Sequence, residues 1–213
     1  YTYGHVRMHQ NISGEIYVKV PAVENKWNFV GAPFNVYDLY AVRMFYNPHG
    51  SNSDASAVRF DYTTNDWETV LSYGEDTIRP GEGFLAWPFY AGGITFSTKR
   101  DYGGVGGATQ EVYTDFVLNN DTVYVEKNIT TENTNKWMAL ANPYPAKLCV
   151  NAFVENNSDV IYDDQDQSTQ IQGQGVYILN AASSSWSFMD SDDNYDLGVG
   201  QGFFVNVKNS GTN

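Results

Sequence analysis

Two stretches of this chain, KWNFVGAPF (residues 26–34) and KWMALANPY (residues 136–144), align without gaps and set the expected fold. A second pair follows them in the same order. PGEGFLA (residues 80–86) and VGQGFFV (residues 199–205) share both glycines and the first phenylalanine. Motifs that recur in one order at a long period indicate an internal repeat. The repeat is too long for a solenoid, so it predicts either tandem domains or two halves of one pseudo-symmetric domain.

Short segments rich in β-branched and aromatic residues, bounded by Gly, Pro, Asn or Asp, fill both halves. This pattern predicts β-strands, and Thr122–Lys127 is one of them. Tyr37–Phe45 and Ala146–Val154 occupy the same slot after the Pro-aromatic turn and are the best places for a short helix. The expected fold class is all-β, with two tandem, diverged β-sandwich or jelly-roll-like repeats.

The boundary between the repeats is predicted from glycine. Residues 103–107 are the glycine-dense stretch of the chain, and they lie between the two copies. We expect a first repeat at 1–102, a Gly-rich linker at 103–109 and a second repeat at 110–213. Both ends of the sequence have the character of cut strands, so we expect the chain to be part of a larger protein.

The tryptophans recur with the repeat. Trp27 corresponds to Trp137, and Trp67 to Trp186, with a longer hairpin turn expected in the second copy. Two copies of one fold need the same packing but not the same chemistry, so we interpret these rings as core or hairpin anchors. The paired glycines of the second motif predict a tight turn or a bulge with positive φ that leads into a buried strand.

Composition excludes several classes of partner. The chain has 12 basic and 25 acidic side chains, a formal net charge of −13. Residues 108–213 alone hold 4 basic and 14 acidic ones. Nucleic acids and anionic lipids need a basic face, so neither is expected as a partner. No apolar run reaches membrane-spanning length, and we expect no membrane insertion. The single cysteine, Cys149, cannot form a disulfide within the chain.

The motifs resemble modules of large secreted and cell-surface proteins of Bacteroidetes. In those modules a W-N-x-x-G-N-P-Y-P … P-G-Q-G-F-F-V signature lies upstream of a type IX secretion sorting domain. Trp137–Pro145 and Gly198–Val205 carry the resemblance best, and Trp27–Phe34 and Ile78–Phe84 carry a weaker version. The resemblance implies export and an extracellular or outer cell-surface location, often beside adhesins or enzymes.

A ligand contact is predicted at Trp87 and Tyr90. Strand alternation places Trp87 opposite Ala86, and its aligned partner in the second copy is the polar Asn206. We therefore expect this position to be partly exposed, where an aromatic ring could stack on a sugar or dock a protein. Packing between the repeats is the alternative.

Calcium is the one metal that the sequence suggests, because two acidic loops of the second copy gather hard oxygen ligands. The spacing differs from an EF-hand, and solvated loops are the alternative. The candidate ligands are Asp163, Asp164, Asp166, Asp190, Asp192, Asp193 and Asp196.

Thr77 and Thr122 each stand in an Asp-Thr-apolar tripeptide, which resembles the O-glycosylation acceptor of Bacteroidetes exported proteins. Entry into a strand explains the same residues equally well.

No catalytic residue is predicted. A glycosidase-like carboxylate pair would have to be unique to one copy, because Glu82 aligns with Gln201. We expect a non-catalytic surface module with a structural or adhesive role, whose partners are other surface proteins or glycans. A carbohydrate-binding module attached to a glycan-degrading enzyme is the alternative.

Overall fold

The protein is all-β, with antiparallel sheets and one short helix in the part of the chain that is described. The expected linker at 103–109 and the expected helix at Tyr37–Phe45 lie outside that part. The computed structural model describes residues 17–33, 57–62, 64–69, 78–88, 93–97, 99–102, 110–113, 119, 122–127, 137–162 and 173–208.

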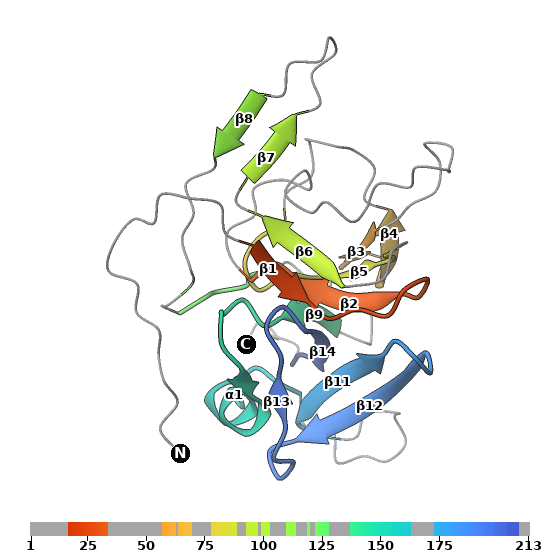
Figure 1. The fold of residues 1–213 in the computed structure, drawn as a ribbon. Coiled ribbons are helices and arrows are strands. Elements are labelled where there is room, and N and C mark those ends of the chain that lie inside the picture. Colours follow the sequence, from red (N-terminus) through yellow and green to blue (C-terminus); the bar gives the residue numbers. More distant parts are fainter. Residues whose placement is uncertain are drawn as a thin grey trace.

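Two four-stranded sheets form the body of the protein, one from each half of the sequence (Figure 1). The first has the order β2-β5-β3-β4, and the second, counted from its other edge, has the order β9-β14-β11-β12. The strands that carry the aligned motifs, β2 with β9 and β5 with β14, therefore occupy the same places in their sheets. The bounds are β2 Asn28–Gly31, β3 Ala57–Asp61, β4 Asp66–Thr69, β5 Gly83–Ala86, β9 Trp137–Ala141, β11 Gly175–Asn180, β12 Ser185–Asp190 and β14 Gly202–Asn206.

Smaller elements surround these sheets as three strand pairs and a helix. β7 and β8 pair on either side of residues 103–109. The helix α1 confirms the prediction made for Ala146–Val154, although it begins later, after Cys149. The bounds are β1 Tyr17–Val20 with β6 Ile94–Ser97, β7 Lys99–Tyr102 with β8 Gln110–Tyr113, β10 Leu148–Cys149 with β13 Asp196–Leu197, and α1 Val150–Asn156.

The strand predicted at Thr122–Lys127 is wrong. These residues are extended, but they belong to no strand ladder. Their alternating pattern is that of a strand, and a ladder also needs a neighbouring strand, which local sequence does not report.

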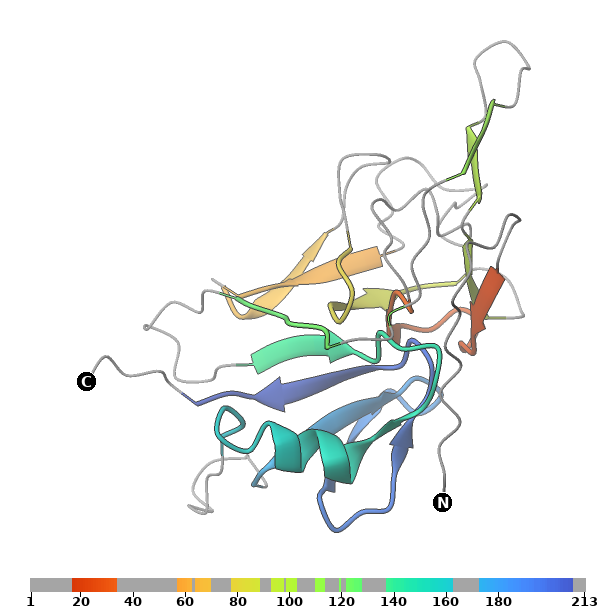
Figure 2. The same ribbon diagram turned by 90° about the vertical axis from the view of Figure 1, so that its left-hand side faces the viewer.

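The central strands are apolar on both faces because each sheet is covered on both sides. In β14, Phe203 and Val205 pack with the helix cluster, while Phe204 faces the other sheet. In β5, Phe84 belongs to the cluster beneath β1 and β6, and Leu85 faces inward. Figure 2 shows α1 on the side of β14 and β9 that is turned away from the first sheet.

The two sheets share one aromatic core. Phe29 from the first half and Phe204 from the second lie 4.9 Å apart between ring centroids. Trp67 contacts both rings, at 5.6 and 5.5 Å. Trp186 contacts the same two rings, at 5.9 and 5.4 Å, although 45% of its surface stays exposed. The interpretation of the repeated tryptophans as packing residues agrees with these contacts.

The expected longer turn in the second hairpin is wrong. Trp67 pairs with Phe60 across the first hairpin, and Trp186 pairs with Leu179 across the second. The turns are residues 62–65 and 181–184, which are equal in length. Tyr177, the residue that resembles Tyr62, lies within β11, so the residues between Tyr177 and Trp186 include strand as well as turn.

A reciprocal contact joins the two halves. The N–H of Gly31 donates to the carbonyl oxygen of Gly200 at 2.9 Å, and the N–H of Ala141 donates to that of Gly81, also at 2.9 Å. Gly31 aligns with Ala141, and Gly200 aligns with Gly81. The same hydrogen bond is therefore made twice, once from each half to the other. The halves thus meet about an approximate twofold axis. Two isolated bridges repeat the exchange, Val30 with Gln201 and Leu140 with Glu82.

Candidate functional site

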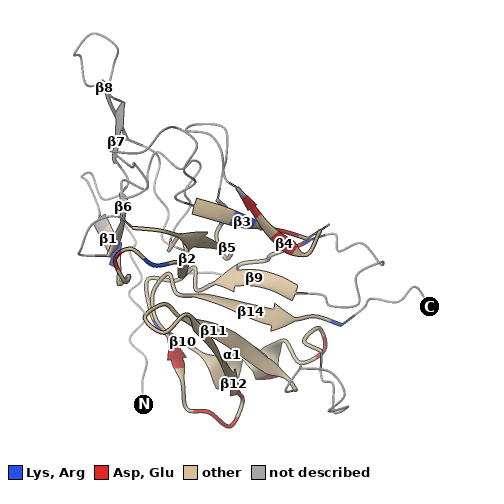
Figure 3. Ribbon diagram, turned by 90° about the vertical axis from the view of Figure 1, so that its right-hand side faces the viewer, with Lys and Arg blue, Asp and Glu red and all other residues tan. Residues whose placement is uncertain are grey.

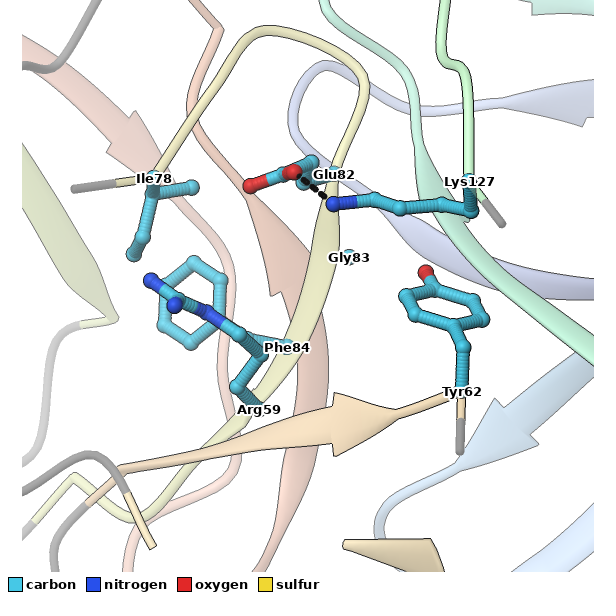
Figure 4. Close-up of a pocket in the computed structure, with 7 residues that line it drawn as sticks. All are labelled: Arg59, Tyr62, Ile78, Glu82, Gly83, Phe84 and Lys127. Carbon is cyan, nitrogen blue, oxygen red and sulfur yellow. Dashed lines mark hydrogen bonds and ion pairs between the residues drawn. The ribbon is translucent and has the colours of Figure 1, made fainter. Parts of the chain in front are cut away.

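A small pocket lies beside this junction, and it has room for about one water molecule. Three of its residues carry charges: Arg59 on β3, Glu82 just before β5, and Lys127 at the end of the extended segment from the second half (Figure 4). Tyr62, Ile78, Gly83 and Phe84 complete the lining.

Glu82 is fully engaged in this pocket. Its Oε1 accepts a hydrogen bond from Nζ of Lys127, and its Oε2 accepts one from the N–H of Arg79 at 3.1 Å. Both partners of the ion pair are largely buried. Charge-assisted contacts of this kind are among the stronger hydrogen bonds, so the pair fixes residues 122–127 against the first half.

Tyr62 is a structural donor in the same pocket. Its hydroxyl donates to the carbonyl oxygen of Ala139 at 3.2 Å, and Nζ of Lys127 lies 5.3 Å from the centre of its ring. Burial raises the pKa of Tyr62 to about 12, with a smaller upward contribution from the Glu82 charge. The phenol is therefore neutral near pH 7, where it donates a hydrogen bond rather than acting as a base.

The second half builds the matching turn without charge. Oε1 of Gln201 accepts from the N–H of Gly198 at 2.8 Å, as Glu82 does from Arg79. Nε2 of Gln201 donates to the hydroxyl of Tyr195 at 3.1 Å. The carboxylate of Glu82 and the amide of Gln201 therefore play the same structural role: each accepts a hydrogen bond that closes the turn before β5 or β14.

Asn142 belongs to the motif at residues 136–144 and links it to the turn before β14. Its side chain is fully buried, and Nδ2 donates to the carbonyl oxygens of Ala146, Leu197 and Gly198 at 2.7, 3.2 and 3.0 Å. Its Oδ1 accepts from the N–H of Tyr144 at 3.0 Å. One amide thus holds together two turns that are far apart in sequence.

The predicted ligand contact is described only in part, since Tyr90 lies outside the described residues. Trp87 is half-buried and meets Trp27 edge to face, with ring centroids 5.3 Å apart. The partial exposure predicted for Trp87 is confirmed, but the polar residue that suggested it, Asn206, is itself buried, with only 5% of its surface exposed. β14 is covered on both faces, so even a polar residue at this position is buried.

Only some of the predicted calcium ligands lie in the described part of the chain. Asp163, Asp164 and Asp166 lie outside the described residues. In the turn after β12, the carboxylates of Asp190 and Asp193 accept backbone N–H groups of the turn itself. Nζ of Lys147 lies 3.5 Å from Asp196, and Asp192 is exposed.

In Figure 3 the ribbon is red at the acidic residues of this turn and of β4. Within the described ranges, no three His, Cys, Asp or Glu side chains gather in a way that could hold a metal ion.

Of the two predicted glycosylation sites, Thr77 lies outside the described residues. Thr122 is exposed at the start of the extended segment.

Comparisons with protein-family models, with curated proteins and with solved structures find no match for this chain. No helix in the described part of the chain is both long and apolar enough to cross a membrane.

Sequence reasoning missed the Glu82–Lys127–Tyr62 group. The charged pair is separated by 45 residues, and nothing in either local pattern points to the other. The aligned Gln201 was a usable signal, because a Glu-to-Gln exchange between repeats preserves a hydrogen-bonding role and removes only charge.

Proposed function

We propose that this chain is a non-catalytic extracellular module with a structural or adhesive role, and that it forms part of a larger exported protein. The proposal is supported above all by the structural role of the motif residues. Gly31, Gly81, Ala141 and Gly200 make the reciprocal junction, and Asn142 ties two turns together. The motif thus serves folding, as expected for a rigid module that recurs within long surface proteins.

The polar groups of the pocket support the same proposal. Glu82 is occupied by an ion pair and a turn, and the high pKa of Tyr62 keeps the phenol protonated. The resemblance of Trp137–Pro145 and Gly198–Val205 to modules of Bacteroidetes surface proteins supports export.

Protease shaving of intact cells of the source organism tests the location. We expect peptides of this chain to be released while a cytoplasmic marker stays inside. Release only after lysis would contradict an extracellular location. Turnover of polysaccharide or ester substrates by the purified chain, abolished by one substitution, would contradict the non-catalytic role.

A carbohydrate-binding role is the second candidate, and the half-buried Trp27–Trp87 pair is the observation that favours it. A sugar ring could stack on the accessible part of Trp87. In a glycan array, Trp87→Ala should remove binding, while Tyr124→Ala, which removes a ring that is 83% exposed, should retain it. Equal binding by both variants would contradict a site at Trp87.

Calcium stays a proposal for the acidic loops around Asp163–Asp166 and Asp190–Asp196. An extracellular site of Kd about 10⁻⁴–10⁻³ M would fill at millimolar calcium. The melting temperature should then rise with calcium relative to EDTA. An unchanged value would refute the site.

O-glycosylation of Thr77 and Thr122 also stays a proposal. The intact mass of the protein isolated from its source, with no added hexose on either peptide, would argue against it.

A further inference from the structure

The residues where the two halves meet on their approximate twofold axis are unlike in size. Gly31 aligns with Ala141, and a β-carbon built on Gly31 would overlap the β-carbon of Ala141. Two aligned positions that face each other in this way lie at the axis itself. The junction therefore has room for one β-carbon at this point, and the second half supplies it.

A second side chain on the axis is the ring of Phe29. A β-carbon on Gly83 would lie 2.7 Å from Cε2 of Phe29, and one on Gly202 would lie 2.5 Å from Cδ2 of the same ring. Gly83 and Gly202 are aligned glycines, one from each half, so the ring between them occupies the axis. The residue aligned with Phe29 is Ala139, which is fully buried. Because a ring from each half would fill the same space, only one half can carry it.

These two positions give the halves complementary faces. The first half presents a ring at Phe29 and no side chain at Gly31, whereas the second half presents alanine at both aligned positions. Two second halves facing each other would place two Ala141 β-carbons at one point. Two first halves would place two Phe29 rings in one space. Both like pairings are therefore overpacked, while the unlike pairing fills the axis once.

We propose that this junction is a selective interaction surface, on which the face of each half fits the unlike half and excludes a like one. The chain satisfies the surface internally, because the covalent link gives its own second half a high effective concentration. A second copy of this chain is the partner from outside that the surface accepts, and it is accepted only by exchange of unlike halves between the two copies. The inference does not rest on the proposed function.

Moving the axial ring from one half to the other tests the fit within one chain. Phe29→Ala leaves the axis empty and Ala139→Phe places two rings on it, so each should lower the melting temperature by roughly 10 °C. The double variant Phe29→Ala/Ala139→Phe again has one axial ring, supplied by the other half. It should regain most of the summed loss, as measured by thermal unfolding of the whole chain.

The matched control makes the same two kinds of substitution on opposite faces of the first sheet. Ala57 is buried in the cluster beneath β1 and β6, so a ring there does not fill the space left by Phe29. Phe29→Ala/Ala57→Phe should therefore show the sum of its two single losses. A double variant at positions 29 and 139 that is no more stable than this control would overturn the proposal.

A smaller change keeps the test decisive if a variant with a new ring fails to fold. Gly31→Ala places two β-carbons on the axis, and adding Ala141→Gly removes one of them. The second substitution should regain part of the loss in melting temperature. The remainder comes from the carbonyl oxygen of Glu82, which would lie 2.7 Å from the new β-carbon. A loss that Ala141→Gly leaves unchanged would contradict the shared axial space.

Two full-length variants test whether the surface accepts a second copy. Ala139→Phe has two axial rings and Phe29→Ala has none, so each is mismatched within its own chain. Exchange of halves would set Phe29 of the first variant against Ala139 of the second, and the introduced ring against the introduced alanine. An equimolar mixture refolded from urea should therefore give a dimer by light scattering, while each variant refolded alone stays monomeric. Monomers in the mixture, or dimers of either variant alone, would contradict selective pairing of unlike halves.

Discussion

Single buried polar side chains hold this fold at the points where its turns meet. From a fully buried position, Asn142 donates to three carbonyl oxygens, of which that of Leu197 makes a buried hydrogen bond. Tyr62 reaches from the first half to the backbone of β9 in the second. The asparagine could be recognised in the sequence as part of a turn motif. Its partners could not, because Leu197 and Gly198 come from a segment more than 50 residues away.

Replacing Asn142 with Ala should destabilise the protein by about 3 kcal/mol, because it removes a fully buried amide with its four hydrogen bonds and leaves the carbonyl oxygen of Leu197 without this donor. Urea unfolding followed by tryptophan fluorescence measures this loss. Asn156→Ala is the matched control, since Asn156 is exposed and bonds only within its own helix. The control should change stability by less than about 0.5 kcal/mol. Equal effects of the two substitutions would show that the buried amide has no special role.

The raised pKa of Tyr62 predicts that the protein loses stability at alkaline pH. Its pKa is about 12 in the folded protein and 10 in a free tyrosine, so folding favours the neutral phenol. The resulting stabilisation is complete below pH 10 and is lost as the pH rises from 10 to 12.

Tyr62→Phe should therefore lose less stability than the wild type between pH 9 and pH 11.5, as measured by urea unfolding. Tyr124→Phe removes an exposed hydroxyl and should follow the wild-type curve. Identical pH dependence of wild type and Tyr62→Phe would contradict the assignment.

The turns that precede β5 and β14 depend on glycine. Gly81 has φ of +83° and Gly200 has φ of +66°, which confirms the positive φ predicted from the paired motifs. The next glycine of each motif, Gly83 or Gly202, has no positive φ, but a β-carbon there would collide with Phe29. The two glycines of one motif are thus required for different reasons, one for backbone conformation and one for close packing.

Gly200→Ala should cost about 2–3 kcal/mol, because the new β-carbon meets Val20 at 2.6 Å and the conformation is strained. Gly198→Ala is the matched control two residues earlier, where the nearest atom would be Oε1 of Gln201 at 3.4 Å. We expect the control to stay within about 1 kcal/mol of wild type. Thermal unfolding of both variants decides the point, and a loss in Gly198→Ala as large as that in Gly200→Ala would count against it.

Most strands were predictable because each carries its own β-branched or aromatic pattern between turn residues. β10 and β13 were not predictable, since each has only two residues and exists through pairing with the other. The prediction for residues 122–127 was wrong in the opposite way, because these residues have the pattern of a strand but belong to no ladder. Local sequence reports what a segment can do, whereas its neighbours decide what it does.

At the scale of the whole molecule, the two halves are joined through a core that neither could complete alone. Phe29 and Phe204 come from different halves, and each contacts Trp67 and Trp186. The sequence predicted the equivalent motifs and left open whether they form separate domains or one pseudo-symmetric unit. Packing between the sheets depends on contacts across more than 100 residues, which local patterns do not encode.

The reciprocal junction allows a direct test that the two halves act as one unit. The N–H of Gly31 is bonded to the second half, and the N–H of Ala141 is bonded to the first. Native-state hydrogen exchange at increasing denaturant measures the free energy at which each amide opens. If the halves share one cooperative core, the two amides should merge into a single unfolding event with the same free energy and the same denaturant dependence. Opening of Gly31 and Ala141 at free energies several kcal/mol apart would contradict this account.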